Sequence, residues 1–132
     1  MNLVVDTSVI IAVITNEKHK KQLIEVSKGA DLIAPSSLHW EIGNAFSAMF
    51  KRKRISLEKA MAALAGYRQI QIRFYDIELE MALELSSRLN LYAYDAYVIG
   101  CALEHNSPIV SLDGVLLDAA ERAGVATRKV VS

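Results

Sequence analysis

Short apolar runs alternate with stretches of helical periodicity along the whole chain, and this alternation limits the choice of fold more than any other feature. The run NLVVD at residues 2–6 is typical of a buried strand, whereas residues 38–54 repeat apolar side chains at the spacing of one helical face. We expect strands at 2–6, 32–37, 70–76, 107–113 and 125–131, and helices at 8–14, 16–29, 38–54, 56–67, 77–90, 94–106 and 114–124. This order predicts an α/β fold with a mostly parallel sheet.

The length and composition suit one compact domain. The chain has 132 residues, of which 52% are apolar, and its formal net charge is zero, so we expect a single domain over residues 1–132 with a real core. The balanced charge argues against nucleic-acid binding that is driven by bulk charge. The single cysteine, Cys101, allows no internal disulfide and fits a reducing cytoplasm. No apolar run reaches the roughly 18 residues that a membrane-spanning helix needs.

Four acidic residues lie among apolar neighbours, which is an unusual setting for a solvated charge. Asp6 ends the first predicted strand, Glu41 lies early in helix 38–54, Asp95 opens helix 94–106, and Asp113 ends strand 107–113. In parallel sheets, functional groups gather at the carboxyl ends of the strands. Clustered carboxylates repel one another, and Mg²⁺ or Mn²⁺ relieves the repulsion because these hard cations prefer oxygen ligands.

Each acid taken alone also has a simpler interpretation. Asp6 and Asp95 would each be good N-caps for the helices that follow them. Glu41 would be an ordinary solvated helix residue, and Asp113 followed by Gly114 is a common turn signal. The individual signals are therefore weak, and their order along the chain carries the stronger argument.

The segments VVDTSVII, WEIGNAF, YDAYVIGCALEHNSPIVSLD and DAAERAGV together resemble a PIN domain, in particular the VapC-type toxin ribonucleases of toxin–antitoxin pairs. The resemblance covers nearly the whole chain and implies an α/β/α sandwich around a sheet of about five strands. The family's four acidic positions match Asp6, Glu41, Asp95 and Asp113. Ser111 stands where threonine is commoner in the family, and Gly114 where a larger or basic residue often follows.

The resemblance also implies a function, which is metal-dependent hydrolysis of RNA that leaves a 5′-phosphate and a 3′-hydroxyl. Asp6 and Asp95 would be the principal ligands of Mg²⁺ or Mn²⁺, with Glu41 completing the site or activating the attacking water. Asp113 would serve a second ion or the outer shell. The side chains expected to hold these carboxylates by hydrogen bonds are those of Thr7, Ser8, Asn44 and Ser111.

Two features could contact RNA. The basic run at the end of helix 38–54 consists of Lys51, Arg52, Lys53 and Arg54. It would bind phosphates, or it would simply be a set of cations favoured at a helix C-terminus, which is the simpler interpretation. Tyr92, Tyr94 and Tyr97 surround Asp95, and an exposed one would be able to stack on a base.

The toxin interpretation implies a cognate antitoxin and a homodimer as partners. Four alternatives remain open at this stage: a PIN nuclease that processes RNA without being a toxin, a catalytically silent PIN-fold binding module, a haloacid-dehalogenase-type phosphotransferase, and a response-regulator receiver. The phosphotransferase needs a second aspartate where this chain has Ser8. The receiver needs an acidic pair after the first strand, where only Asp6 is present.

Overall fold

A five-stranded sheet forms the centre of the molecule. The computed structural model describes residues 1–15, 18 and 20–130. The strands are β1 (Asn2–Val5), β2 (Asp31–Pro35), β3 (Ile72–Tyr75), β4 (Ile109–Val110) and β5 (Thr127–Arg128). They lie in the order β3-β2-β1-β4-β5, and every neighbouring pair is parallel. The predicted α/β fold with a mostly parallel sheet is therefore confirmed.

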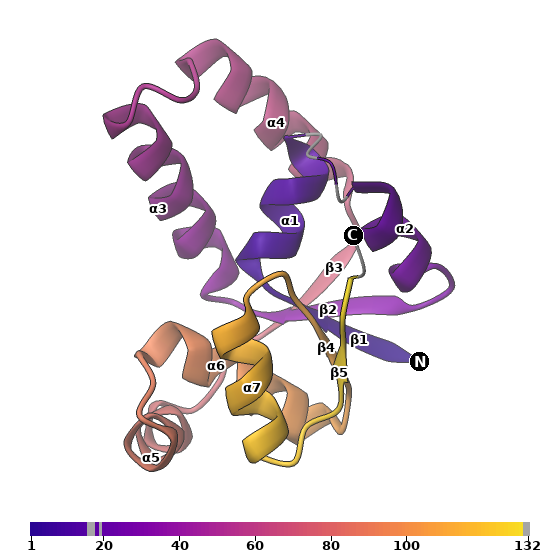
Figure 1. Ribbon diagram of the computed structural model, residues 1–132, viewed down its shortest axis with the longest axis vertical. Coiled ribbons are helices and arrows are strands. Elements are labelled where there is room, and N and C mark those ends of the chain that lie inside the picture. Colours follow the sequence, from indigo (N-terminus) through magenta and orange to yellow (C-terminus); the bar gives the residue numbers. More distant parts are fainter. Residues whose placement is uncertain (16–17, 19, 131–132) are drawn as a thin grey trace.

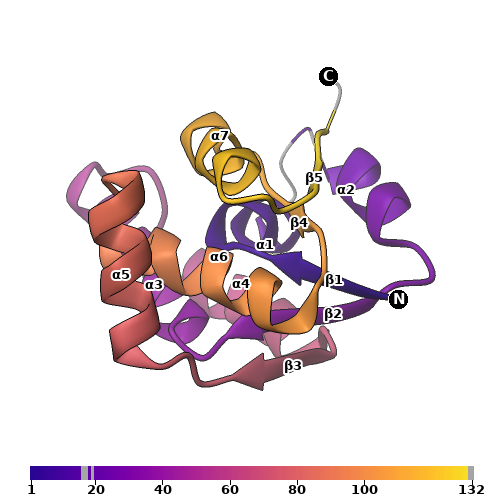
Figure 2. The same cartoon turned by 90° about the horizontal axis from the view of Figure 1, so that it is seen from below.

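Helices cover both faces of this sheet (Figure 1 and Figure 2). They are α1 (Thr7–Ile14), α2 (Lys20–Ser27), α3 (Leu38–Lys51), α4 (Leu57–Gln69), α5 (Leu79–Leu89), α6 (Ala93–His105) and α7 (Gly114–Arg122). Successive residues of β1 point to opposite faces: Val4 belongs to the core under α5, α6 and α7, and Leu3 and Val5 belong to the core under α1, α2, α3 and α4. Because both faces are covered, β1 is apolar throughout, as central parallel strands usually are.

Several predicted helix ends are confirmed. The hydroxyl of Ser56 caps α4 by accepting from the backbone N–H of Lys59 at 3.2 Å. Asn90 ends α5 in the left-handed conformation, at φ 57°. Gly124 follows α7 at φ +86°, which only a residue without a Cβ adopts at little cost.

Other boundaries differ from the prediction. The strands predicted at 107–113 and 125–131 shrink to β4 and β5, of two residues each. Strand β4 stops early because the hydroxyl and amide groups of Ser111, Leu112 and Asp113 bind one another and α1 instead of a neighbouring strand. Residues 16, 17, 19 and 131, which the predictions included, lie outside the described residues.

Two further features concern the single cysteine and the apolar length of the helices. Cys101 lies on the buried side of α6, where burial raises the pKa of its thiol to about 12, so the thiol stays protonated at neutral pH. Across residues 1–15, 18 and 20–130, no helix is long and apolar enough to cross a membrane.

Candidate active site

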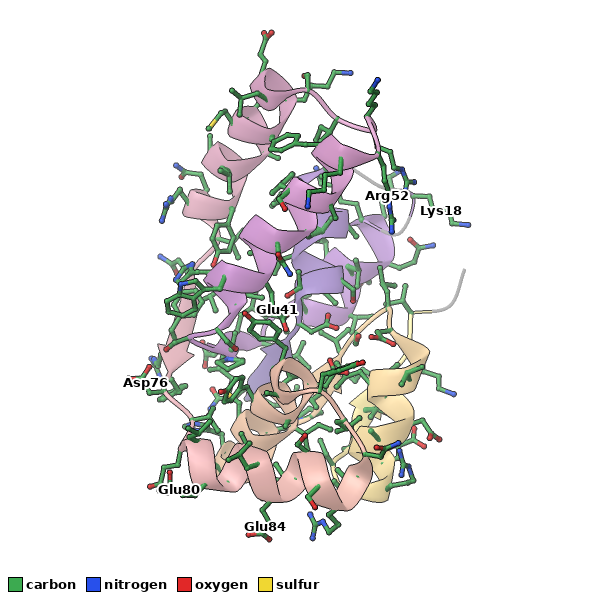
Figure 3. The ribbon with its side chains drawn as sticks, turned by 90° about the vertical axis from the view of Figure 1, so that its left-hand side faces the viewer. Lys18, Glu41, Arg52, Asp76, Glu80 and Glu84 are labelled. Atoms are coloured by element: carbon green, nitrogen blue, oxygen red, sulfur yellow. The ribbon has the colours of Figure 1, made fainter. Side chains whose placement is uncertain are left out.

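Three of the four predicted acids follow neighbouring strands, and the fourth, Asp95, lies on a helix that packs against the sheet. Asp6 directly follows β1, Glu41 lies in the first turn of α3 after β2, and Asp113 lies between β4 and α7. Asp95 lies in the first turn of α6, which packs on β1 and β2. In Figure 1, α1 and α3 run upward from the middle of the molecule and α7 runs downward from it, so these helices begin near one another. Figure 3 shows Glu41 in this middle region.

Asp6 is the buried member of the group. Its side chain is only 6% exposed, and both of its carboxylate oxygens accept hydrogen bonds. Oδ1 accepts from the Ser8 hydroxyl at 2.8 Å and from the backbone N–H of Val9 at 3.2 Å, and Oδ2 accepts from the Ser111 hydroxyl at 2.5 Å. Asp6 therefore does cap α1, as the simpler interpretation predicts. A solvent-exposed cap would have served as well, so capping does not explain the burial.

Two serines tie the ends of β1 and β4 together around Asp6. The oxygen of Ser8 accepts from the backbone N–H of Leu112 at 2.9 Å, and its hydroxyl lies 3.3 Å from that of Ser111. The oxygen of Ser111 also accepts from the backbone N–H of Asp113 at 2.9 Å. Because Ser8 and Ser111 are far apart in the chain, this contact exists only once β1 and β4 are paired.

A separate hydrogen bond orients Glu41. The hydroxyl of Thr7 donates to Oε2 of Glu41, so the first turns of α1 and α3 are joined at the site. Thr7, Ser8 and Ser111 thus each donate a hydrogen bond to one of the predicted acids, as expected from the sequence. Asn44 does not: it is exposed, and in the part of the chain that the structure describes it makes no hydrogen bond to an acid.

Asp95 and Asp113 differ in what their carboxylates do. Helix α6 begins at Ala93 with Tyr92 as its N-cap, so the interpretation of Asp95 as a cap is wrong. The half-buried carboxylate of Asp95 has no hydrogen-bond partner within the described residues. Asp113 is exposed and caps α7, with Oδ1 accepting from the backbone N–H groups of Val115 and Leu116 at 3.0 and 3.3 Å. Capping uses one oxygen of Asp113 and leaves the other.

The pKa values of Asp6, Glu41 and Asp95 are raised. Burial is the main cause of the raised pKa in Asp6, Glu41 and Asp95 alike. The charge of Asp113 adds to the rise in Asp6, the charges of Asp6 and Asp95 add to it in Glu41, and those of Asp113 and Asp6 add to it in Asp95. Hydrogen bonds from Ser111, Ser8 and Thr7 oppose it. The charge of Asp6 therefore reaches Glu41 and Asp95, and the charge of Asp113 reaches Asp6 and Asp95.

Comparison with known proteins identifies the family of the chain. The family model of the PIN domain matches residues 3–122. The chain belongs to the PIN domain family. The resemblance seen in the sequence is thereby confirmed, and no curated protein shows a significant match to the chain.

Solved structures share the fold of this PIN domain at low sequence identity. PAE2754 from Pyrobaculum aerophilum is 20% identical over 96% of this chain and 83% of that chain, with a TM-score of 0.74. DNA-bound VapBC from Salmonella typhimurium is 18% identical over 99% of each chain, with a TM-score of 0.69. VapC20 from Mycobacterium tuberculosis, a sarcin–ricin loop cleaving toxin, is 16% identical over 94% of this chain and 96% of that chain, with a TM-score of 0.65. At these identities the likeness shows the fold.

The donor set of this PIN domain fits a hard divalent cation. It consists of carboxylate and hydroxyl oxygens, and within the described residues no lysine or arginine forms an ion pair with Asp6, Glu41, Asp95 or Asp113. In the same part of the chain, no three His, Cys, Asp or Glu side chains lie close enough to ligate one ion together. Mg²⁺ is commonly held by only one or two carboxylates and completes its coordination shell with water. A group of acids in which no three side chains reach one ion therefore still suits Mg²⁺.

The N-termini of four helices add a favourable field. The acids lie at the N-cap or in the first turn of α1, α3, α6 and α7. The partial positive charge at a helix N-terminus stabilises nearby anions, typically by about 0.3–1 kcal/mol each. This PIN domain thus partly offsets the repulsion between its acids before any ion binds.

The basic run lies at the other end of α3. Lys51 is the last residue of that helix, and Arg52, Lys53 and Arg54 follow it, all of them exposed. At about 1.5 Å per residue, the length of α3 separates this run from Glu41 by roughly 15 Å. Phosphate binding by these residues stays a prediction, and their position also fits the favourable placement of cations at a helix C-terminus.

Removing the hydroxyl of Ser111 is expected to destabilise this PIN domain. Ser111→Ala leaves Oδ2 of Asp6 without a donor in a buried position, so the free energy of unfolding should fall by about 1–3 kcal/mol. Denaturant unfolding monitored by circular dichroism measures the change. Ser107→Ala is the matched control, since Ser107 is also a buried serine but donates to the carbonyl of His105 at the far end of α6. Equal destabilisation by both variants would contradict a special role for the Ser111 hydroxyl.

Proposed function

We propose that this PIN domain is a metal-dependent endoribonuclease and the toxin of a toxin–antitoxin pair. One observation carries the proposal: Asp6, Glu41 and Asp95 are brought to one sheet edge where burial and mutual repulsion raise their pKa values, and no lysine or arginine of the described residues forms an ion pair with them. That arrangement does not stabilise the folded chain, because buried carboxylates without a counter-charge destabilise it. Such a cluster is useful to a protein that binds a cation there.

Each acid has a role that follows from its contacts. Asp6 and Asp95 would hold Mg²⁺ or Mn²⁺: Asp6 is immobilised by three hydrogen bonds, and Asp95 has no protein partner within the described residues that would compete for its oxygens. Glu41, oriented by Thr7 and with a raised pKa, would position the attacking water and accept its proton. The free oxygen of Asp113 would serve a second ion or the outer shell. A bound cation would neutralise charge on the phosphate and lower the pKa of the attacking water.

The toxin half of the proposal is supported by the relatives. VapBC from Salmonella typhimurium is a complex, and VapC20 is described as a toxin that cleaves the sarcin–ricin loop. We infer that this chain likewise has RNA as its substrate and a small antitoxin protein as its partner, and that it forms a homodimer. A neighbouring reading frame that encodes a small DNA-binding protein would favour the toxin over a PIN nuclease that processes RNA without an antitoxin.

Metal removal tests the nuclease half. We expect purified protein to cleave single-stranded RNA in Mg²⁺ or Mn²⁺, to lose activity to background after chelation, and to regain it when the metal is restored. The products should carry 5′-phosphate and 3′-hydroxyl ends, which end-specific labelling of the fragments identifies. Cleavage that persists in chelator, or products with 2′,3′-cyclic phosphates, would contradict the proposal. No cleavage under any condition would favour a silent binding module.

A further inference from the structure

A cleft of about 470 Å³ lies between the first turns of α3 and α6. Trp40 comes directly before Glu41, and Tyr94 directly before Asp95, so the cleft and the acidic group share the same two helix ends. The side chains that matter for the argument are Trp40, Tyr94, Tyr97, Ser36, Ser37 and Asp76. Figure 3 shows Asp76 at one edge of the view in which Glu41 lies near the middle. The volume falls within the range of small-ligand sites.

The aromatic side chains of the cleft are unusually open to solvent. Trp40 is 64% exposed and Tyr94 41% exposed. Tryptophan is highly buried in most proteins, and exposed apolar patches commonly mark binding surfaces. Tyr94 and Tyr97 meet edge to face, with their ring centroids 6.4 Å apart. The cleft therefore offers rigid aromatic rings on α3 and α6 to a ligand.

Ser36, Ser37 and Asp76 form the polar part of the remaining wall, beside Pro35 and Ile77. The hydroxyl of Ser36 donates to Oδ1 of Asp76 at 2.6 Å, which fixes the carboxylate at the end of β3. The second oxygen of Asp76 has no hydrogen-bond partner in the described part of the chain, so it is left as an acceptor. Ser37 stands at the N-cap of α3, but its side chain makes no capping bond, so its hydroxyl is available to a ligand too.

We propose that this cleft binds an unpaired nucleobase of the RNA, beside the phosphate that the acids address. The proposal rests on the nuclease function proposed above. A flat base would stack on the aromatic rings, and its edge would reach Asp76 and Ser37. The free carboxylate oxygen accepts hydrogen bonds only, so it would bind a donor on the base edge, which is an exocyclic amino group or a ring N–H. The base must leave a helical stack to enter, so the substrate class is single-stranded RNA.

The chain provides a specific reporter for this cleft. Trp40 is the only tryptophan in the sequence, so tryptophan emission reports on the cleft alone. We expect single-stranded RNA to quench that emission in the Asp95→Asn protein with Mg²⁺, with gels confirming that the RNA stays intact. A fully paired duplex of the same sequence should quench far less. Unchanged emission on binding of single-stranded RNA would overturn the inference.

The second test compares the cleavage kinetics of variants that keep Asp95 and carry one substitution each. Trp40→Ala should raise KM about 5- to 150-fold with little change in kcat, the range expected for loss of one stacked base. Trp40→Phe should recover most of the loss. Asp76→Asn replaces the accepting carboxylate with an amide and should raise KM about 10-fold. Leu57→Ala is the control, because Leu57 is 60% exposed on α4 and does not line the cleft, and it should change nothing.

The outcomes separate this inference from the function on which it rests. Metal-dependent cleavage with the same KM in Trp40→Ala would leave the nuclease in place and overturn the base-binding cleft. Absence of cleavage in the unaltered protein would overturn the nuclease itself. If emission of Trp40 responds to the antitoxin and not to RNA, the cleft belongs to a protein partner, and the inference is wrong.

Discussion

Asp95→Asn is expected to lower metal-dependent RNA cleavage by about 1000-fold or more. The substitution keeps the shape of the side chain but removes a charged oxygen ligand that no protein group occupies in the described residues. Loss of several kcal/mol of transition-state stabilisation corresponds to a rate loss of that size. Single-turnover cleavage of a labelled oligonucleotide, compared between the variant and the unaltered protein at saturating Mg²⁺, measures it.

The control for this experiment is another aspartate. Asp118 is exposed on α7 and pairs with Arg122 at 3.4 Å, away from the acidic group. Asp118→Asn removes the same charge and should leave cleavage unchanged. If Asp95→Asn cleaves at the rate of the unaltered protein while its circular dichroism spectrum is also unchanged, Asp95 has no part in the mechanism. If Asp118→Asn loses activity as well, the effect is one of net charge.

The same substitution is expected to stabilise the metal-free protein. The folded pKa values of Asp6, Glu41 and Asp95 are raised, so their contribution to stability is fully present below the ordinary values of 3.8 and 4.5. It is lost as the pH rises through the raised values. At neutral pH, Asp95→Asn removes one of these charges and should raise Tm by a few degrees, the shift that about 1 kcal/mol produces in a domain of this size. In acid, where Asp95 is protonated, the gain should disappear.

Bound metal should make the unaltered protein more stable than Asp95→Asn, which is the reverse of the order expected without metal. At a concentration about 100-fold above its dissociation constant, a cation that binds only the folded state stabilises it by about 2.7 kcal/mol, or roughly 10 °C in Tm. We expect this increase in the unaltered protein and little of it in Asp95→Asn. Thermal melts with and without Mg²⁺, across a pH series, check both halves. A metal-free midpoint that is unchanged or lower in the variant would contradict a crowded acidic site.

Local patterns were enough to predict the elements of this fold. The β-branched run of β1 and the helical spacing of α3 appear in the sequence because side chains repeat every two residues in strands and every 3.6 in helices. The caps at Ser56 and Asn90 were equally readable, since each acts within its own helix end. Prediction failed where a distant partner intervenes: β4 ends early because its last residues bind α1.

The candidate site was predictable only in part. The four acids were identified from their apolar surroundings and their order, with help from the family resemblance, and the structure brings each of them within range of the charge of at least one other. The roles of Thr7, Ser8 and Ser111 as hydrogen-bond donors to those acids followed too. The cleft was missed. Its one signal in the sequence was that Trp40 and Tyr94 each come directly before an acid, and no local pattern shows that α3 and α6 begin side by side.

The amino-acid sequence by itself determined the order of the strands and helices, because propensity, periodicity and capping act over a few residues. The tertiary structure alone decided that Ser8 and Ser111 meet on Asp6, that Asp95 is not a helix cap, and that an aromatic cleft opens between α3 and α6. Those contacts join residues far apart in the chain. They depend on strand order and helix packing, which bring together groups that no short stretch of sequence contains.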